Sequence, residues 1–224
     1  MKTWKMAAPV LLATTVLCAL PAAAEEGRVT VGVSGGTYGI GPELAYRFNE
    51  HVGLRASGGF FTFNDSEEID DIDYDSKLKL KSVGAALDWF PAGGGFRVSV
   101  GGRANNNKIQ LKGAPTTNVE IGDITYTPAQ AGTLTGTVKG AHSFAPTLTL
   151  GYGGKLAPGF TVGFELGVMA QGSPKIRNLQ STGGTLSSNA AFLAELEQER
   201  QKAEDDVDDF KLWPVLQLGF LYRF

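Results

Sequence analysis

The thirteen residues Leu212–Phe224, LWPVLQLGFLYRF, decide the fold. Every second residue from Phe224 back to Pro214 is apolar or aromatic, whereas the residues between them include Gln217 and Arg223. Alternation with a period of two predicts a β-strand that has two different faces. An apolar face of this length is typical of a strand with lipid on one side and a polar barrel interior on the other.

Seven further segments alternate in the same way. They span residues 28–33, 40–48, 52–63, 77–90, 96–105, 144–152 and 160–171. In the last of these, for example, apolar Phe164 and Leu166 flank the charged Glu165. The sequence therefore predicts an all-β fold, an eight-stranded antiparallel up-and-down transmembrane β-barrel.

The predicted connections alternate in length, except that the first one, at residues 34–39, is short where a long loop would stand. Residues 49–51, 91–95 and 156–159 form short turns, and the long loops are 64–76, 106–143 and 172–210. Short turns at one end and long loops at the other are typical of outer-membrane barrels, in which the long loops are extracellular. Aromatic residues also collect near the strand ends, where the two membrane interfaces would lie.

The first 24 residues have the features of a secretory signal peptide. Lys2 and Lys5 precede an apolar run over 6–20, and residues 22–24 are alanines that provide a cleavage site. The run is shorter than the roughly 20 residues that a membrane-spanning helix needs. We therefore expect residues 1–24 to be removed and residues 25–224 to form the barrel.

Charge and cysteine content exclude several classes of function. Without Lys2 and Lys5, 18 of the 20 basic residues remain against 23 acidic residues, a net charge of −5. This acidic balance argues against a nucleic-acid partner. The single cysteine, Cys18, lies in the signal peptide, so no disulfide or thiol chemistry is expected. No motif calls for a cofactor.

The strand number, the loop asymmetry, the signal peptide and the terminal QLGFLYRF resemble small eight-stranded outer-membrane barrels of the OmpA, OmpX and opacity-protein type. Residues 41–55 (GPELAYRFNEHVGLR) and 87–102 (LDWFPAGGGFRVSVGG) also resemble proteobacterial proteins described as hypothetical outer-membrane proteins. The resemblance implies a location in the outer membrane and no activity. It also implies that Phe220, Tyr222 and Phe224 form the signal that the barrel-assembly machinery engages.

Charged residues indicate which face of the strands is inside. One face carries Glu43, Arg47, Arg55, Asp88, Arg97, Arg103, Glu165 and Arg223. A soluble lipocalin-type barrel has an apolar interior, where so many charges would carry a heavy desolvation cost. We therefore expect a membrane barrel whose lumen is plugged by salt bridges between these residues. The alternative is a small pore or channel for ions or small polar solutes.

Loop 64–76 contains seven acidic residues. Asp71, Asp73 and Asp75 have the alternate spacing of calcium loops, but no turn glycine follows them, and Ser82 stands where a bidentate glutamate is needed. We expect an exposed acidic loop, with calcium as the weaker hypothesis.

Lys77, Lys79 and Lys81 follow this loop directly. If the register of the fourth strand continues upward, the three lysines face outward at the extracellular rim, beside lipopolysaccharide phosphates. The alternative is a β-bulge that turns them to the other face.

Loop 172–210 contains a predicted helix over 189–210, which Ser188 and Asn189 can cap. Its apolar stripe consists of Phe192, Leu193, Leu196, Ala203, Val207 and Phe210, and its other face is acidic. One interpretation is that the stripe packs on neighbouring loops, especially 106–143. The other is a partner-binding helix or a lid over the barrel mouth.

We do not expect an enzyme. A Ser/His/acid site needs a base beside its nucleophile. His51 lies in a predicted short turn, and His142 adjoins Ser143, where neighbours in a strand point to opposite faces. The expected role is structural or surface interaction through the extracellular loops. The expected partners are outer-membrane lipid and lipopolysaccharide, the assembly machinery, and an extracellular partner that the sequence does not identify.

Overall fold

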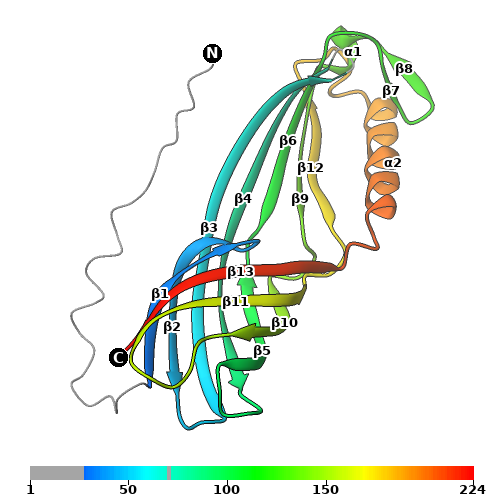
Figure 1. The fold of residues 1–224 in the computed structure, drawn as a ribbon. Coiled ribbons are helices and arrows are strands. Elements are labelled where there is room, and N and C mark those ends of the chain that lie inside the picture. Colours follow the sequence, from blue (N-terminus) through cyan, green and yellow to red (C-terminus); the bar gives the residue numbers. More distant parts are fainter. Residues whose placement is uncertain (1–27, 70–71) are drawn as a thin grey trace, which may run out of the picture.

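The computed structural model describes residues 28–69 and 72–224, and the predicted signal peptide lies outside them (Figure 1). Within the described residues eight strands close into a ring in which every neighbouring pair is antiparallel. In ring order they are β1 (Val29–Gly36), β2 (Gly39–Arg47), β3 (Val52–Ile69), β4 (Ile72–Trp89), β5 (Phe96–Asn105), β10 (Phe144–Tyr152), β11 (Gly159–Ala170) and β13 (Leu212–Arg223). Each corresponds to one predicted strand, so the eight-stranded antiparallel barrel is confirmed.

Side chains alternate across the barrel wall as the pattern of Leu212–Phe224 predicts. Along β13, Gln217 and Arg223 are buried, whereas Leu218 and Phe220 are 63% and 74% exposed. Large apolar side chains thus cover the outside of the barrel, and charged side chains fill the inside. This distribution is the reverse of that in a soluble protein and is typical of a transmembrane barrel. Among the described residues, none of the helices is long and apolar enough to cross a membrane.

The described residues of the predicted loop 64–76, namely 64–69 and 72–76, form strands instead. Strands β3 and β4 pair without interruption from Val52 opposite Trp89 to Ile69 opposite Ile72. Acidic residues have low β-propensity, so the composition of this segment favoured a loop. Strand β4 pairs with β6 (Lys108–Pro115) as well as with β3. The backbone hydrogen bonds of this pairing stabilise the strand despite the low β-propensity of its residues.

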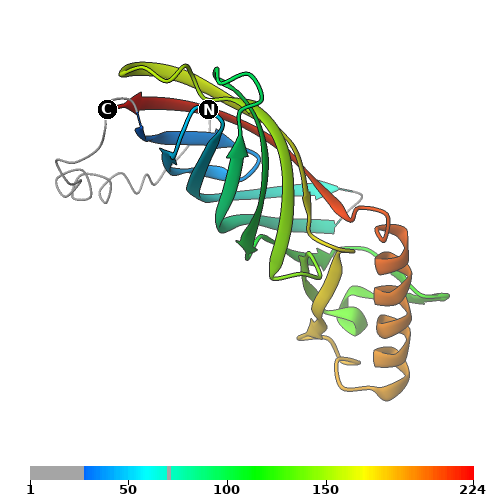
Figure 2. The same ribbon diagram turned by 90° about the horizontal axis from the view of Figure 1, so that it is seen from below.

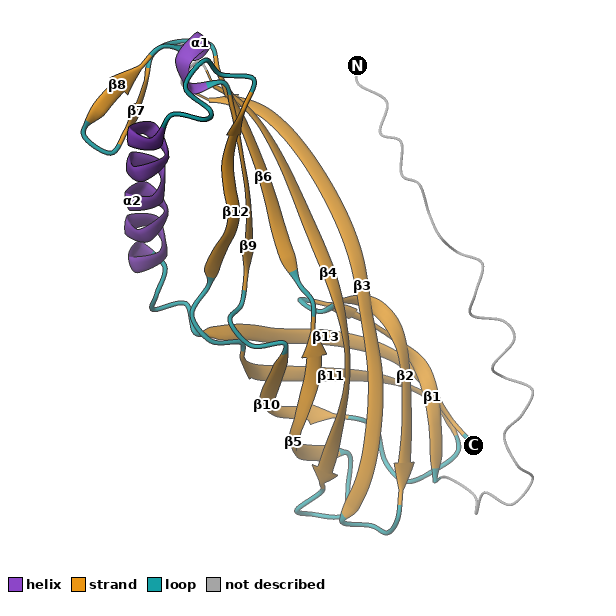
Figure 3. Cartoon of the chain, turned by 180° about the vertical axis from the view of Figure 1, so that it is seen from behind, coloured by secondary structure: helices purple, strands orange, loops and turns teal. Residues whose placement is uncertain are grey.

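The other two predicted long loops also contain strands. Strand β6, strand β9 (Thr133–Lys139) and strand β12 (Lys175–Thr182) add to β4 in the order β4, β6, β9, β12. Along the chain, β5 leads into β6, β9 leads into β10, and β11 leads into β12. These strands rise above the ring in Figure 3. We call β6, β9 and β12, together with the parts of β3 and β4 beside them, the upper sheet.

A small apolar core joins the remaining elements to the upper sheet. These elements are the hairpin of β7 (Val119–Ile121) and β8 (Ile124–Tyr126), helix α1 (Pro128–Ala131) and helix α2 (Ala190–Asp206). Phe192 and Leu196 of α2 are buried against Ile121, Tyr126 and Ala131. The helix therefore packs on residues of the segment 106–143, as one interpretation of its stripe expected. In Figure 2, α2 lies at the opposite end of the molecule from the C-terminal end of β13.

Helix α2 is shorter than predicted. Asn189 caps it, because its side chain accepts hydrogen bonds from the backbone of Ala191 at 2.9 Å and of Phe192 at 3.2 Å. The helix ends at Asp206, within an acidic run that interacts unfavourably with the negative end of a helix dipole. Phe210 therefore lies beyond the helix and is 65% exposed, and Leu193 is also exposed. The predicted stripe was wrong at these two residues.

Candidate functional site

The centre of the barrel lumen holds an ion-pair network around Arg55. Arg55 on β3 donates to the two carboxylate oxygens of Asp88 on β4, at 3.1 and 3.2 Å, and pairs with Glu165 on β11. Ser99 Oγ donates to Asp88 Oδ1 at 2.6 Å. Thr149 Oγ1 donates to Glu165 Oε1 at 2.7 Å. All five residues are buried, so these polar groups are removed from water. Because the residues come from strands on opposite sides of the ring, the network links opposite walls of the barrel.

Arg97 and Glu43 lie beside this network. Arg97 Nη2 is 3.5 Å from Glu165 Oε2, and Arg97 Nε is 3.9 Å from Asp88 Oδ2. Glu43, Arg97 and Glu165 together line a cavity of about 10 Å³, which has room for about one water molecule. The structure thus brings five of the eight predicted lumen charges together, namely Glu43, Arg55, Asp88, Arg97 and Glu165.

Arg47 and Arg223 bind backbone carbonyls at the lower end of the barrel, the end opposite the upper sheet. Arg47 donates to the carbonyl of Glu50 at 2.6 Å and to the carbonyl of Gly94 at 3.0 Å. These two hydrogen bonds link the short turn 49–51 to the short turn 91–95. Arg223 donates to the carbonyl of Gly153 at 3.0 Å. Sequence reasoning predicted acidic partners for these arginines. It missed the carbonyls because every residue carries one and no residue type marks them.

Arg103 occupies the upper end of the lumen. It donates to Ser57 Oγ at 2.8 Å and to Ser82 Oγ at 3.1 Å. Its guanidinium carbon lies 3.9 Å from the ring centre of Tyr38, a cation–π contact in the turn between β1 and β2. Tyr38 was not predicted as part of the lumen; the available signal was a single large aromatic residue within the glycine-rich stretch SGGTYG.

The three predicted rim lysines lie on one face of β4. Because β3 and β4 pair without a register shift, the bulge considered for this stretch is absent from their pairing. Lys77, Lys79 and Lys81 therefore share the face of β4 that carries exposed Val83 and Trp89 lower down. Lys79 lies beside Lys108 of β6. Partial desolvation, followed by repulsion from Lys77 and Lys108, lowers the pKa of Lys79.

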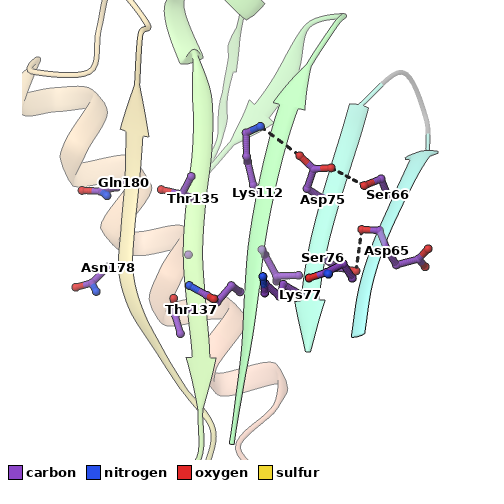
Figure 4. A pocket seen from close by; sticks show the side chains of 14 residues that line it. Asp65, Ser66, Asp75, Ser76, Lys77, Lys112, Thr135, Thr137, Asn178 and Gln180 are labelled. Carbon is purple, nitrogen blue, oxygen red and sulfur yellow. Dashed lines mark hydrogen bonds and ion pairs between the residues drawn. The ribbon is translucent and has the colours of Figure 1, made fainter. Parts of the chain in front are cut away.

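A hollow of about 570 Å³ lies on the upper sheet above Lys79, and Lys77 is among its lining residues (Figure 4). Most of its lining carries hydroxyl or amide groups, and its charged lining residues are Asp65, Asp75, Lys77 and Lys112. Figure 4 also shows α2 behind this part of the sheet.

Of the three aspartates considered for calcium, the structure describes the side chain of Asp75 alone. Asp75 accepts hydrogen bonds from Ser66 at 2.7 Å and Lys112 at 3.2 Å, and both bonds lower its pKa. Asp71 lies outside the described residues. Within the described part of the chain, no group of three or more His, Cys, Asp or Glu side chains is arranged to hold a metal ion.

The aromatic residues near the end of the chain cluster at the lower end of the barrel. The ring of Tyr222 lies 4.8 Å from the ring of Phe160 and 4.8 Å from the ring of Phe224. Phe160, Phe220 and Phe224 are all exposed. Aromatic clusters of this kind are typical of the girdles at the membrane interfaces of transmembrane barrels.

Glu204 joins helix α2 to the edge strand of the upper sheet. Its carboxylate accepts from the backbone N–H of Ile176 at 2.8 Å, from Lys175 at 3.2 Å and from Arg200 at 2.5 Å. Burial acts to raise the pKa of Glu204, but these three donors outweigh it and the pKa is lowered. The contact also covers part of an exposed strand edge, which would otherwise be free to pair with another chain.

The histidine beside Ser143 does not lie in a strand. Residues 140–143 form the connection between β9 and β10, and the His142 backbone donates to the carbonyl of Gln171 at 3.0 Å. The geometric argument that strand neighbours point to opposite faces therefore does not apply to this pair.

The fold defines a class of protein, a closed eight-stranded antiparallel β-barrel with an apolar outside and a charged inside. The solved structures that are similar to it include two outer-membrane proteins of Acinetobacter baumannii named CarO2 and CarO. The crystal structure of Acinetobacter baumannii CarO2 matches with a TM-score of 0.60 and 23% identity, over 90% of this chain and 100% of that one. The crystal structure of Acinetobacter baumannii CarO matches with a TM-score of 0.59 and 21% identity, over 88% of this chain and 98% of that one. No protein-family model and no curated sequence matches the chain.

Proposed function

We propose that this chain is an outer-membrane protein, exported by a signal peptide over residues 1–24, whose barrel is plugged by its own charged side chains. The upper sheet and α2 then form an extracellular surface for interaction with other molecules. The observation that carries the proposal is the buried network around Arg55, beside which the cavity is only about 10 Å³. An eight-stranded barrel is just wide enough for side chains to fill.

Two further features support a place in the membrane. The barrel exterior carries a continuous set of exposed apolar side chains, and aromatic residues gather at its lower end. The elements above the barrel are rich in polar groups and have short apolar stretches. This division suits a protein that spans a bilayer with its ring and exposes its upper sheet to water. Engagement of Phe220, Tyr222 and Phe224 by the assembly machinery belongs to the same proposal.

We also propose a non-enzymatic role. The buried polar cluster in the lumen consists of arginines and carboxylates that pair with one another, rather than of a base beside a free nucleophile.

Conductance recording tests the plugged lumen. The purified barrel, reconstituted into a planar bilayer, is expected to show no sustained conductance steps. Sustained conductance of the intact protein would overturn the plugged lumen and favour the small pore for ions or polar solutes.

Cysteine labelling tests the topology, because residues 25–224 contain no cysteine of their own. Lys202→Cys places a thiol on the exposed face of α2, and Ala92→Cys places one in an exposed lower turn. A membrane-impermeant maleimide added to intact cells is expected to label the first variant and to leave the second unlabelled until the outer membrane is permeabilised. The reverse pattern would reject this orientation.

A further inference from the structure

Four lysines from four different strands form one row across the upper sheet. Cross-strand pairing places Lys79 opposite Lys108, Lys108 opposite Lys139, and Lys139 opposite Lys175. Residues that lie opposite one another in a sheet share a face, and adjacent strands lie about 4.8 Å apart. The four positions therefore span about 14 Å on one side of the sheet. The lysines come from separate parts of the sequence, so only the pairing of strands reveals this lysine row.

The lysine row has few counter-charges. Among the described residues, Glu204 pairs with Lys175, and no carboxylate lies within ion-pair distance of Lys79, Lys108 or Lys139. Asp65 and Asp75 both line the hollow, and Asp75 pairs with Lys112 two rows above Lys79. Like charges directly opposite each other destabilise a sheet. An arrangement that is unfavourable in the isolated protein indicates an anionic ligand that offsets the repulsion.

The lysine row lies directly above the apolar outer face of the barrel. Val83, Ala104 and Phe144 form an apolar row on the same face, and Phe144 is 67% exposed. Val83 lies four positions after Lys79 along β4, a distance of about 13 Å along the strand. Lys77 and Lys81 lie on this face immediately above and below Lys79. The lysines thus follow the apolar exterior of the barrel at the height where lipid headgroups would begin.

The hollow lies on the other side of the lysine row from the barrel. Its next rows pair Lys77 with Gln110 and Thr137, and Asp75 with Lys112, Thr135 and Gln180. Amide and hydroxyl groups there offer neutral hydrogen-bond donors and acceptors. Going up the face, the chemistry changes from apolar to cationic to a mixed polar surface, in which amides and hydroxyls stand beside two aspartates and two lysines.

We propose that this face binds one phosphorylated glycolipid of the outer leaflet, with its acyl chains on the barrel wall, its phosphates on the lysine row and its sugars in the hollow. The order of groups along the face matches the order along such a lipid, and lipopolysaccharide is the molecule with this chemistry in an outer membrane. The inference rests on the membrane location in the proposed function. It adds Lys108 and Lys139 to a site for which the sequence had indicated only Lys77, Lys79 and Lys81, whereas Glu204 of α2 holds Lys175.

A binding titration on the full folded barrel in detergent tests this inference. The ligands are lipid A with both phosphates, the same lipid A with both phosphates removed, and lipopolysaccharide that also carries core sugars. Native mass spectrometry or thermophoresis measures binding. Wild-type protein is expected to bind phosphorylated lipid A at least tenfold more tightly than the dephosphorylated form. Equal binding of the two forms would overturn the proposal.

A matched pair of variants locates the phosphate contact. The row variant combines Lys79→Gln, Lys108→Gln and Lys139→Gln, and the control variant combines Lys155→Gln, Lys202→Gln and Lys211→Gln, which removes the same charge away from this face. The row variant is expected to lose at least tenfold in affinity for phosphorylated lipid A, and the control to stay within twofold of wild type. Equal losses would indicate nonspecific attraction and contradict the site.

Removal of mutually repelling charges is not expected to unfold the upper sheet, and heat-induced gel shifts check this. If the row variant does not fold, the single variant Lys108→Gln and the wild-type preference for phosphorylated lipid still decide the outcome. Competition by inorganic phosphate at the same concentration as the lipid would favour a free-phosphate site and overturn the glycolipid. Preferential binding of an acidic peptide over lipid A would favour a protein partner and overturn it as well.

The hollow has its own test. Gln110→Ala combined with Thr137→Val is expected to leave binding of lipid A unchanged and to remove any added affinity for the form with core sugars. Bilayer insertion and α2 labelling are measured on the same preparations. A barrel that inserts in the expected orientation but does not select the phosphorylated lipid overturns this inference alone.

Discussion

The barrel and the upper sheet share strands β3 and β4, yet they hold their charges in opposite ways. In the barrel, Arg55 is buried and its donors meet Asp88 and Glu165. In the upper sheet, Lys79 and Lys108 remain at the surface beside each other. A buried charge is costly without a partner, whereas a surface charge keeps its hydration. The same alternation of side chains therefore has two outcomes. In the barrel it places charges inside, where they pair and stabilise the closed ring, and in the upper sheet it leaves lysines at the surface, where a ligand can reach them.

The largest expected effect is at the centre of the lumen. Arg55→Ala leaves Asp88 and Glu165 buried without their main partner, which is expected to cost about 3–5 kcal/mol. Unfolding in detergent with increasing denaturant measures this loss. Arg97→Ala is the comparison variant, and its smaller expected loss follows from its longer ion pairs of 3.5 and 3.9 Å. Equal losses for the two variants would mean that the network is not centred on Arg55.

The second largest expected effect is the loss of packing in the small apolar core between α2 and the upper sheet. Phe192 is 1% exposed, and its ring contacts the ring of Tyr126 edge-on at 4.9 Å. Phe192→Ala removes this packing and is expected to cost about 3–4 kcal/mol locally, so that α2 opens while the barrel stays closed. Hydrogen exchange over residues 190–206 measures the opening. The neighbouring variant Leu193→Ala should change little, because Leu193 is exposed; similar exchange in both variants would contradict the assigned core.

The third effect is pH-dependent and concerns the attachment of α2 to β12. Because the pKa of Glu204 is lowered in the folded protein, its stabilising contribution is complete above the ordinary glutamate pKa of about 4.3 and is lost as the pH falls through the lowered value. Cleavage of α2 by pepsin is therefore expected to increase at the acidic end of a pH series.

Glu204→Gln is the control for this pH series. Glutamine keeps the shape of the side chain and removes the titration, at an expected cost of about 1–2 kcal/mol for weaker hydrogen bonds. At each pH the cleavage rate of wild type is divided by the cleavage rate of this variant. Pepsin's own pH dependence affects both rates equally and is therefore removed from the ratio. A ratio that does not change with pH would rule out a role for Glu204 in holding the helix.

The smallest effect is at the start of α2. Asn189→Ala removes the hydrogen bonds that its side chain accepts from Ala191 and Phe192 and is expected to cost about 1 kcal/mol. Faster hydrogen exchange in the first turn of the helix, with unchanged exchange in the barrel, would show this loss. Asn189→Asp should restore protection, since aspartate is an equally good N-cap.

Much of the barrel could be predicted because its signal is local and repeated. Alternation in segments such as 96–105 and 144–152 located strands that the structure reproduces with the same bounds. The charges at Arg55 and Glu165 could likewise be placed inside from their position between apolar neighbours. Their distances, and the separation of Arg47 and Arg223 from the central network, could not be predicted, because they depend on how strands curve around the ring.

The upper sheet was predicted poorly for a physical reason. Residues 64–76 are acidic, and the strands β6 and β12 contain glycine, asparagine and lysine, all of which are poor strand formers. These segments become strands because each offers its backbone hydrogen bonds to a neighbour that is distant in sequence.

The sequence by itself determined the eight barrel strands, the face of each that points inward, and the helix that Asn189 caps. These features follow from periodicity and capping, which act over a few residues. Only the tertiary structure decided that β6, β9 and β12 extend the barrel wall, that Phe192 meets Tyr126, and that Lys79, Lys108 and Lys139 form one row. Contacts of this kind depend on which strands pair, and these strands pair with neighbours that lie far away in the sequence.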